Sequence, residues 1–297
     1  WYDGCETYAN EYSVLLSGNT SVSEESKAKE LKKLRTLLAA ALMALTVVAA
    51  PTASAAERNL VAFGDSLLAD PSADVYLSTR VTSSTANGAN CPSGNNYAKR
   101  TGAKLGLRVR DHSCSGAVSM SPGPQISTQV SNAIRTGSLN PSTQRVIFTS
   151  GFNDTYNNRN LSRQQLRDRF VRTTAPQIER IKRAAPNARI QIVGYPTIGS
   201  GNYYCLVHVS SRPSDTTLLP EVRSWEDSAQ WMQVDLARAT GTEFVDLKGA
   251  TRNNGMCANA SQRYFAGLID FTAGNGNLPI HVNARGHEAL ASILART

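Results

Sequence analysis

The sequence lacks several features that would assign it to a common functional class. Its five cysteines include no C-x-x-C pair, so a zinc site of the usual spacing is a poor interpretation. Its main apolar run, residues 37–50, is 14 residues long and interrupted only by Thr46, whereas a membrane-spanning helix needs about 20 residues. We find no internal repeat or low-complexity tract. The chain therefore reads as a globular protein with a short apolar segment near its N-terminus.

That apolar segment has the order of a secretory signal peptide. The basic stretch "LKKLR" at 31–35 precedes it, and the small residues Ala53, Ser54 and Ala55 follow it as an A-x-A cleavage site. We expect residues 31–55 to be the signal peptide and 56–297 the mature, folded domain. Residues 1–30 are interpreted as a non-native extension, with translation starting near Leu31. No cysteine follows the cleavage site closely enough to carry a lipid anchor, so the expected product is soluble and secreted.

Negative charge is scarce in the expected mature chain. Residues 56–297 hold 26 basic and 17 acidic side chains, a net charge of +9. This charge would favour an anionic envelope or lipid interface, or simply keep a secreted protein soluble. The basic residues are spread out, and the densest stretch, residues 163–183, is interpreted as the solvated face of a helix. We therefore expect no nucleic-acid partner.

Four cysteines remain in the mature part: Cys91, Cys114, Cys205 and Cys257. An even number in an exported chain indicates two disulfides, and four cysteines allow three connectivities. Proximity in the sequence favours Cys91 with Cys114 and Cys205 with Cys257.

Short β-branched runs alternate with segments of helical period, which is typical of a parallel sheet covered by helices. Strands are predicted at 59–64, 108–113, 144–150, 188–195 and 242–247. Helices are predicted near 95–106, 125–136, 161–185, 222–240 and 284–296. Two segments, 68–94 and 196–221, stay unassigned, and loops of this length form either a binding rim or inert surface.

Four residues in short sequence blocks attract attention: Ser66 in "FGDSLLAD", Gly116 in "CSGA" and Asn153 in "GFND" follow predicted strands, and His281 in "HVNARGH" comes just before the last predicted helix. Each alone is better explained as a turn, cap or loop residue. Together they make chemical sense, because ligands gather at the carboxyl ends of parallel strands. A serine nucleophile needs a base such as His281. The oxyanion needs donors, which the N–H groups of Ser66 and Gly116 and the Asn153 amide would supply.

These four blocks, in this order, resemble the secreted GDSL esterases and lipases of the SGNH hydrolase superfamily. The stretch from Cys91 to "CSGA" also looks like the actinobacterial, disulfide-bearing branch. The resemblance implies a three-layer α/β/α sandwich with a five-stranded parallel sheet, similar to flavodoxin, and the strand count agrees. It further implies that Ser66 is the nucleophile, His281 the general base, and Ser66, Gly116 and Asn153 the oxyanion hole, without metal or organic cofactor.

The histidine block departs from the family pattern. Most members carry Asp three residues before the catalytic histidine, and here that position is Leu278. We expect the backbone carbonyl of Leu278 to orient His281, with Asp270 as the alternative if a carboxylate does so. Val282 replaces the usual Pro after the histidine. His287 is interpreted as structural, and it is the first alternative base if His281 is not the base.

The resulting expectation is a secreted, monomeric serine hydrolase of carboxylic esters, an esterase or lipase with phospholipase A activity as an extension. Its partners would be an ester or lipid substrate and an anionic envelope or lipid interface. Two alternatives stay open. One is a polysaccharide O-acetyl esterase, and the other is a non-catalytic envelope or carbohydrate-binding protein on the same scaffold.

Overall fold

The computed structural model describes residues 57–81, 91–274 and 276–297, together with Lys29. The predictions made for residues 1–30 and 31–55 lie outside these residues and stay predictions. The chain divides into two units, Trp1–Ser54 and Ala55–Thr297, and every element named below belongs to the second.

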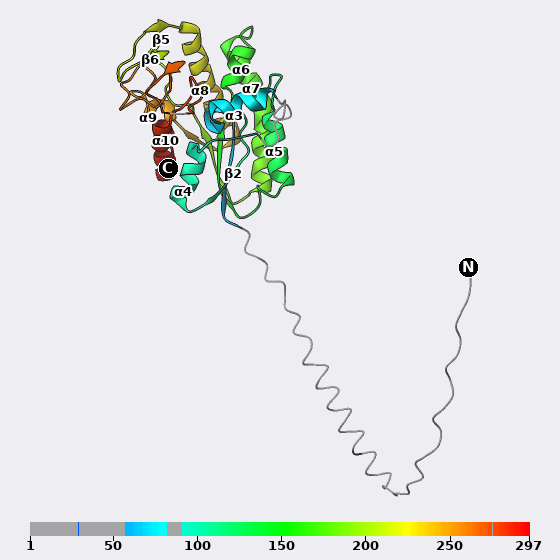
Figure 1. Ribbon diagram of the computed structural model, residues 1–297. Coiled ribbons are helices and arrows are strands. Elements are labelled where there is room, and N and C mark those ends of the chain that lie inside the picture. Colours follow the sequence, from blue (N-terminus) through cyan, green and yellow to red (C-terminus); the bar gives the residue numbers. More distant parts are fainter. Residues whose placement is uncertain (1–28, 30–56, 82–90, 275) are drawn as a thin grey trace, which may run out of the picture. The chain divides into compact units, whose positions relative to one another are not determined.

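A parallel five-stranded sheet forms the centre of this unit (Figure 1). Its strands are β1 (Asn59–Gly64), β2 (Arg108–Asp111), β3 (Thr143–Thr149), β4 (Arg189–Val193) and β8 (Glu243–Val245). They lie in the order β2-β1-β3-β4-β8, with every neighbouring pair parallel. The predicted fold class is confirmed, and each predicted strand coincides with one of these five to within two residues at either end.

The main helices cover both faces of the sheet. They are α4 (Tyr97–Leu105), α5 (Ile126–Arg135), α7 (Arg163–Ala184), α8 (Pro220–Thr240) and α10 (Ala284–Arg296). Successive side chains of β1 pack into two different hydrophobic cores, because successive residues of a strand point to opposite faces of the sheet. Leu60 and Ala62 pack in the core that α4 and α10 complete, whereas Val61 and Phe63 pack in the core formed with α5 and α7. Figure 1 shows these helix pairs on opposite sides of the strands.

Local signals explain where several helices begin and end. The Ser162 side chain caps α7 and Gln165 closes a capping box with it. Asn283 caps α10 by accepting from the N–H of Gly286 at 2.9 Å. Gly106, with a left-handed φ of 64°, ends α4.

The two unassigned segments contain short elements that periodicity does not predict. They are α3 (Ala73–Val81), β5 (Tyr203–Tyr204), β6 (Val207–His208) and β7 (Thr217–Leu218). Further short elements are α2 (Ser66–Ala69), α6 (Phe152–Asn157), α9 (Leu247–Ala250) and β9 (Ile269–Asp270). β5 pairs with β7 antiparallel, and β6 pairs with β9 parallel. None of the helices in the described ranges is both long and apolar enough to span a membrane.

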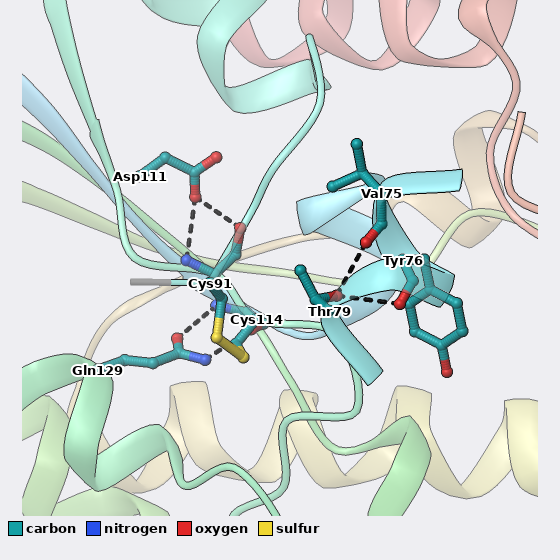
Figure 2. Close-up of a disulfide and its surroundings, with 9 residues drawn as sticks. Val75, Tyr76, Thr79, Cys91, Asp111, Cys114 and Gln129 are labelled. Carbon is teal, nitrogen blue, oxygen red and sulfur yellow. Dashed lines mark hydrogen bonds between the residues drawn. A yellow bond between two sulfur atoms is a disulfide. The ribbon is translucent and has the colours of Figure 1, made fainter. Parts of the chain in front are cut away.

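Both predicted disulfides are confirmed, Cys91–Cys114 and Cys205–Cys257. Figure 2 shows the first bridge beside Gln129 of α5. The buried Gln129 amide accepts from the N–H of Gly64 at 3.0 Å and donates to the Gly64 carbonyl at 2.9 Å. The Cys114 N–H also donates to the Gly64 carbonyl, at 3.0 Å. The carboxyl end of β1 is therefore fixed from two sides.

Candidate active site

Ser66 is the first residue of α2, and one residue, Asp65, separates it from the end of β1. Asp65 caps this short helix by accepting from the N–H of Leu67 at 3.0 Å. A Cβ on Gly64 would lie 2.7 Å from the Thr149 carbonyl oxygen, so the strand must end in glycine at this point. The turn holds the partly exposed Ser66 at the carboxyl end of the interior strand β1.

One cavity of about 420 Å³ brings the four predicted residues together: Ser66, Gly116, Asn153 and His281 all line it. They come from the chain after β1, the chain after β2, helix α6, and the loop before α10. The positions of Ser66, Gly116 and Asn153 after β1, β2 and β3, and of His281 just before the last helix, therefore agree with the sequence prediction. Their roles in catalysis are taken up below as a proposal.

A backbone carbonyl orients His281, but it is not the predicted one. Nδ1 of His281 lies 2.8 Å from the carbonyl oxygen of Pro279. Because a carbonyl only accepts, Nδ1 carries the proton and Nε2 is left as the basic nitrogen. The prediction of the Leu278 carbonyl is wrong by one residue. Ile280 has a left-handed φ of 55°, which brings the chain round so that the Pro279 carbonyl is within reach of the ring.

Asp270, the alternative carboxylate for orienting His281, interacts with other groups. It forms an ion pair with the buried Arg263 at 2.6 Å and accepts from the N–H of Gly267 at 2.9 Å. Burial acts to raise the pKa of Asp270, but the Gly267 and Thr272 hydrogen bonds and the Arg263 charge outweigh it and lower that pKa. Asp270 therefore serves as a structural ion-pair partner, and the alternative in which it orients His281 is wrong.

Burial lowers the pKa of the His281 imidazole, and the hydrogen bond to the Pro279 carbonyl opposes this shift in part. The neutral ring is thus the favoured form near neutral pH. A neutral ring with Nδ1 protonated is the state that a general base needs.

Two of the three predicted oxyanion donors are backbone N–H groups. Within the described residues, no hydrogen bond uses the N–H of Ser66 or of Gly116. Gly116 has φ of 78°, a left-handed conformation that favours glycine. The Asn153 amide is fixed at both ends: its oxygen accepts from Tyr156 at 2.7 Å, and Nδ2 donates to the Ala117 carbonyl at 2.8 Å. The second N–H of Nδ2 is the one that could bind an oxyanion.

Asp154, which sequence reasoning left without a role, holds the loop that follows Gly116. Its carboxylate accepts from the N–H groups of Ser119 at 2.7 Å and Met120 at 3.1 Å, and from the Ser121 hydroxyl at 2.7 Å. Because Asn153 and Asp154 are adjacent, one turn of α6 fixes both the Asn153 amide and the loop that follows Gly116. The signal was present in the sequence as the "GFND" block.

A second buried network lies behind Ser66. The Tyr195 hydroxyl donates to Asp65 and accepts from the N–H of Phe152 at 3.0 Å. Burial is the main cause that raises the pKa of Asp65 to about 7, against the hydrogen bond from Tyr195. Nothing in the local sequence around Tyr195 points to this contact, since 130 residues separate it from Asp65.

His287 does not line the cavity. Its Nδ1 accepts from the N–H of Tyr97 at 3.1 Å, and its Nε2 donates to the Asp70 carboxylate at 2.8 Å. The ring thus links α10 to α4 and to the end of α2, which agrees with the structural interpretation. The described residues contain no group of three His, Cys, Asp or Glu side chains that could hold a metal ion.

Apolar side chains make up most of the remaining cavity wall. They include Phe152, Ile198, Leu206, Leu219, Val222, Trp225 and Met256. Three of them come from the segment 196–221, so this long loop forms part of the binding rim rather than inert surface. An apolar wall beside one polar edge suits a ligand with a hydrocarbon part and one reactive group.

Comparison with known proteins identifies relatives of the chain. The model of the GDSL-like Lipase/Acylhydrolase family matches residues 62–289. Phospholipase A1 from Streptomyces albidoflavus NA297 is 20% identical, with a TM-score of 0.51 over 81% of this chain and 98% of its own, and it has the same fold. An extracellular lipase from Streptomyces rimosus is 19% identical, with a TM-score of 0.49 over 79% of this chain and 98% of that one. No curated protein matches the sequence.

Proposed function

Because the chain belongs to the GDSL-like lipase/acylhydrolase family, we propose that it hydrolyses carboxylic esters with Ser66 as nucleophile and His281 as general base. The observation that carries this proposal is the single cavity lined by Ser66, Gly116, Asn153 and His281. The hydrogen bond from Nδ1 of His281 to the Pro279 carbonyl also supports the proposal, because it leaves Nε2 as the basic nitrogen.

In the proposed reaction, Oγ of Ser66 attacks the ester carbonyl carbon while Nε2 of His281 takes the hydroxyl proton. The N–H groups of Ser66 and Gly116 and the Asn153 amide stabilise the resulting oxyanion. The C–O bond to the alcohol then breaks, and His281 returns its proton to the leaving alcohol. A water molecule, deprotonated by the same Nε2, attacks the acyl-enzyme and releases the acid and free Ser66.

The apolar wall supports an acyl chain as the group that the cavity receives. An acetyl group would leave most of a 420 Å³ cavity unfilled, so an esterase or lipase is favoured over a polysaccharide O-acetyl esterase. We also propose that the enzyme is exported and acts on lipid esters outside the cell. Its two disulfides support this location, because disulfides persist in oxidising compartments.

Hydrolysis of p-nitrophenyl esters from acetate to decanoate tests the proposal, with residues 56–297 as the purified protein. Ser66→Ala is compared with Ser131→Ala, a matched control in which an exposed serine of α5 is changed. We expect activity that rises beyond acetate and is lost only in Ser66→Ala. An inactive wild type, or an active Ser66→Ala, contradicts the proposed function. A profile that peaks at acetate would instead favour the polysaccharide esterase.

A further inference from the structure

Large apolar side chains stand exposed on β6, β9 and the residues that follow them. The exposed fractions are 60% for Val209, 50% for Ile269 and 77% for Phe271. Leu268, at 54%, and Ile280, at 48%, lie on adjoining backbone. Single exposed apolar residues are normal on protein surfaces, whereas a group of them marks a surface that contacts something. We call these five residues the apolar platform.

The platform arises from a strand pair with inverted polarity. In the β6–β9 pair, Val207 faces Ile269 and His208 faces Asp270, and the N–H of Phe271 donates to the His208 carbonyl at 3.0 Å. Side chains alternate along strands. Val207 and Val209 therefore share one face with Ile269 and Phe271. The opposite face, with His208 and Asp270, is buried. A sheet with one face in water has the reverse arrangement, apolar inside and polar outside.

A buried ion pair holds the platform in this orientation. The side chains of Arg263 and Asp270 are 1% and 4% exposed, and Asp270 also accepts from the N–H groups of Gly267 and Thr272, both at 2.9 Å. Turning this segment over to bury Phe271 would separate two desolvated charges, which is strongly unfavourable. The exposure of Ile269 and Phe271 is therefore built into the fold.

The platform adjoins the cavity entrance. The Leu206 carbonyl accepts from the N–H groups of Leu268 at 2.7 Å and Ile269 at 3.0 Å, and Leu206 itself lines the cavity. On the other side, the N–H of Ile280 donates to the Gly267 carbonyl at 3.1 Å, and Ile280 also lines the cavity. The surface that exposes the platform is thus continuous with the path by which an acyl chain would enter.

The charge of the domain favours a negatively charged surface as the partner of the platform. Between residues 264 and 281 the sequence contains one formal charge, Asp270, and Arg263 neutralises it. The loop after β6 carries one charge of each sign: the exposed Arg212, and Asp215, which accepts a hydrogen bond from the backbone of β6 at 2.7 Å. These local charges balance, so the preference for an anionic lipid interface rests on the apolar area together with the domain's net charge of +9.

We propose that the apolar platform docks the enzyme on anionic lipid surfaces and positions the cavity entrance against them. This inference rests on the proposed ester hydrolysis, which supplies the reason for such docking. The lipid surface presents acyl chains at the entrance, and the platform side chains enter its apolar layer while Arg212 contacts the headgroups.

Flotation with phosphatidylcholine vesicles, with and without about one third phosphatidylglycerol, tests the docking. The variants are Val209→Ser with Phe271→Ser, and Arg212→Gln. Ile134→Ser is the matched control, because Ile134 is 37% exposed on α5, which lies apart from β6 in Figure 1. We expect binding to anionic vesicles that falls roughly ten-fold or more in the double variant. We also expect a smaller loss in Arg212→Gln and no change in Ile134→Ser.

Hydrolysis of soluble p-nitrophenyl butyrate by the same variants separates this proposal from the proposed function. We expect rates within two-fold of the wild type, since Val209, Arg212 and Phe271 do not line the cavity. Hydrolysis of phosphatidylglycerol in vesicles should fall together with binding. Wild-type protein that does not bind anionic vesicles, or a double variant that binds equally well, overturns the docking proposal. A dimer of the wild type that the double variant abolishes would also overturn it, because a second copy of the chain would then cover the platform. Vesicle binding without any ester hydrolysis leaves docking intact and rejects the proposed function.

Discussion

Asp65, the residue before the proposed nucleophile Ser66, is expected to make the stability of the fold depend on pH. The side chain is almost fully buried and accepts from the Tyr195 hydroxyl and the N–H of Leu67. Burial outweighs these hydrogen bonds and raises the pKa of the carboxyl from its ordinary value of 3.8 to about 7. Replacing Asp65 by Asn removes the titration and keeps an oxygen that accepts from Leu67.

The size and sign of the effect follow from the pKa values of the two states. The folded protein binds the Asp65 proton more tightly than the unfolded chain, so the folded state is favoured below pH 4. That advantage is lost as the pH rises to about 7. One pKa unit corresponds to about 1.4 kcal/mol. A shift from 3.8 to about 7 therefore costs the wild-type fold on the order of 4 kcal/mol at pH 8 relative to pH 4.

Urea unfolding at intervals from pH 4 to pH 8 measures this directly. Other titrating groups contribute equally to the unfolding free energies of wild type and Asp65→Asn. The informative quantity is therefore the difference between these two free energies at each pH. We expect wild type to lose several kcal/mol relative to the variant over this range. Asp168→Asn, at an exposed position of α7, should parallel wild type. A constant difference between wild type and Asp65→Asn would refute the reasoning.

Three further predictions concern the cavity. The kcat/KM for a short ester should fall on the acid side with an inflection below 6.5, because burial lowers the pKa of His281 and only the neutral ring is a base; a pH–rate profile checks this. Asn153→Ala should lower kcat by roughly 10² to 10³, and Tyr156→Phe, which removes one of the two hydrogen bonds that fix the amide, by less in the same assay. Ile280→Gly should raise the Tm, measured by calorimetry, by about 2 °C, because it relieves the strain of the left-handed backbone. The same change should lower kcat in the ester assay.

Strands and long helices were predictable because their signals are local. β1 was predicted at its observed bounds, since "NLVAFG" is an apolar run that ends in a glycine. The start of α7 follows from its capping box, and the end of α4 from Gly106. The short elements α3 and β5 to β7 were missed, because elements of two to nine residues with no clear period are fixed by tertiary contacts and not by propensity.

The cavity residues were predictable because they lie at strand ends in motif blocks, but their supporting contacts were not. The orienting carbonyl belongs to Pro279 and not Leu278 because Ile280 adopts a left-handed conformation that propensity disfavours for a β-branched residue. The partner of Asp65 is Tyr195, far away in the sequence. The inverted alternation at Ile269 and Phe271 becomes visible only once the pairing of β9 with β6 is known.

Covalent labelling tests the central claim most directly. The purified protein is treated with diethyl p-nitrophenyl phosphate, the p-nitrophenol released is counted, and the modified peptide is identified by mass spectrometry. We expect one equivalent of p-nitrophenol, a single diethylphosphoryl group on Ser66, and labelling at least a hundred-fold slower in His281→Ala, whose base is missing. Loss of esterase activity should follow the labelling. A label on another serine, or a protein that loses activity while Ser66 stays unmodified, would contradict the assignment of Ser66 as the nucleophile.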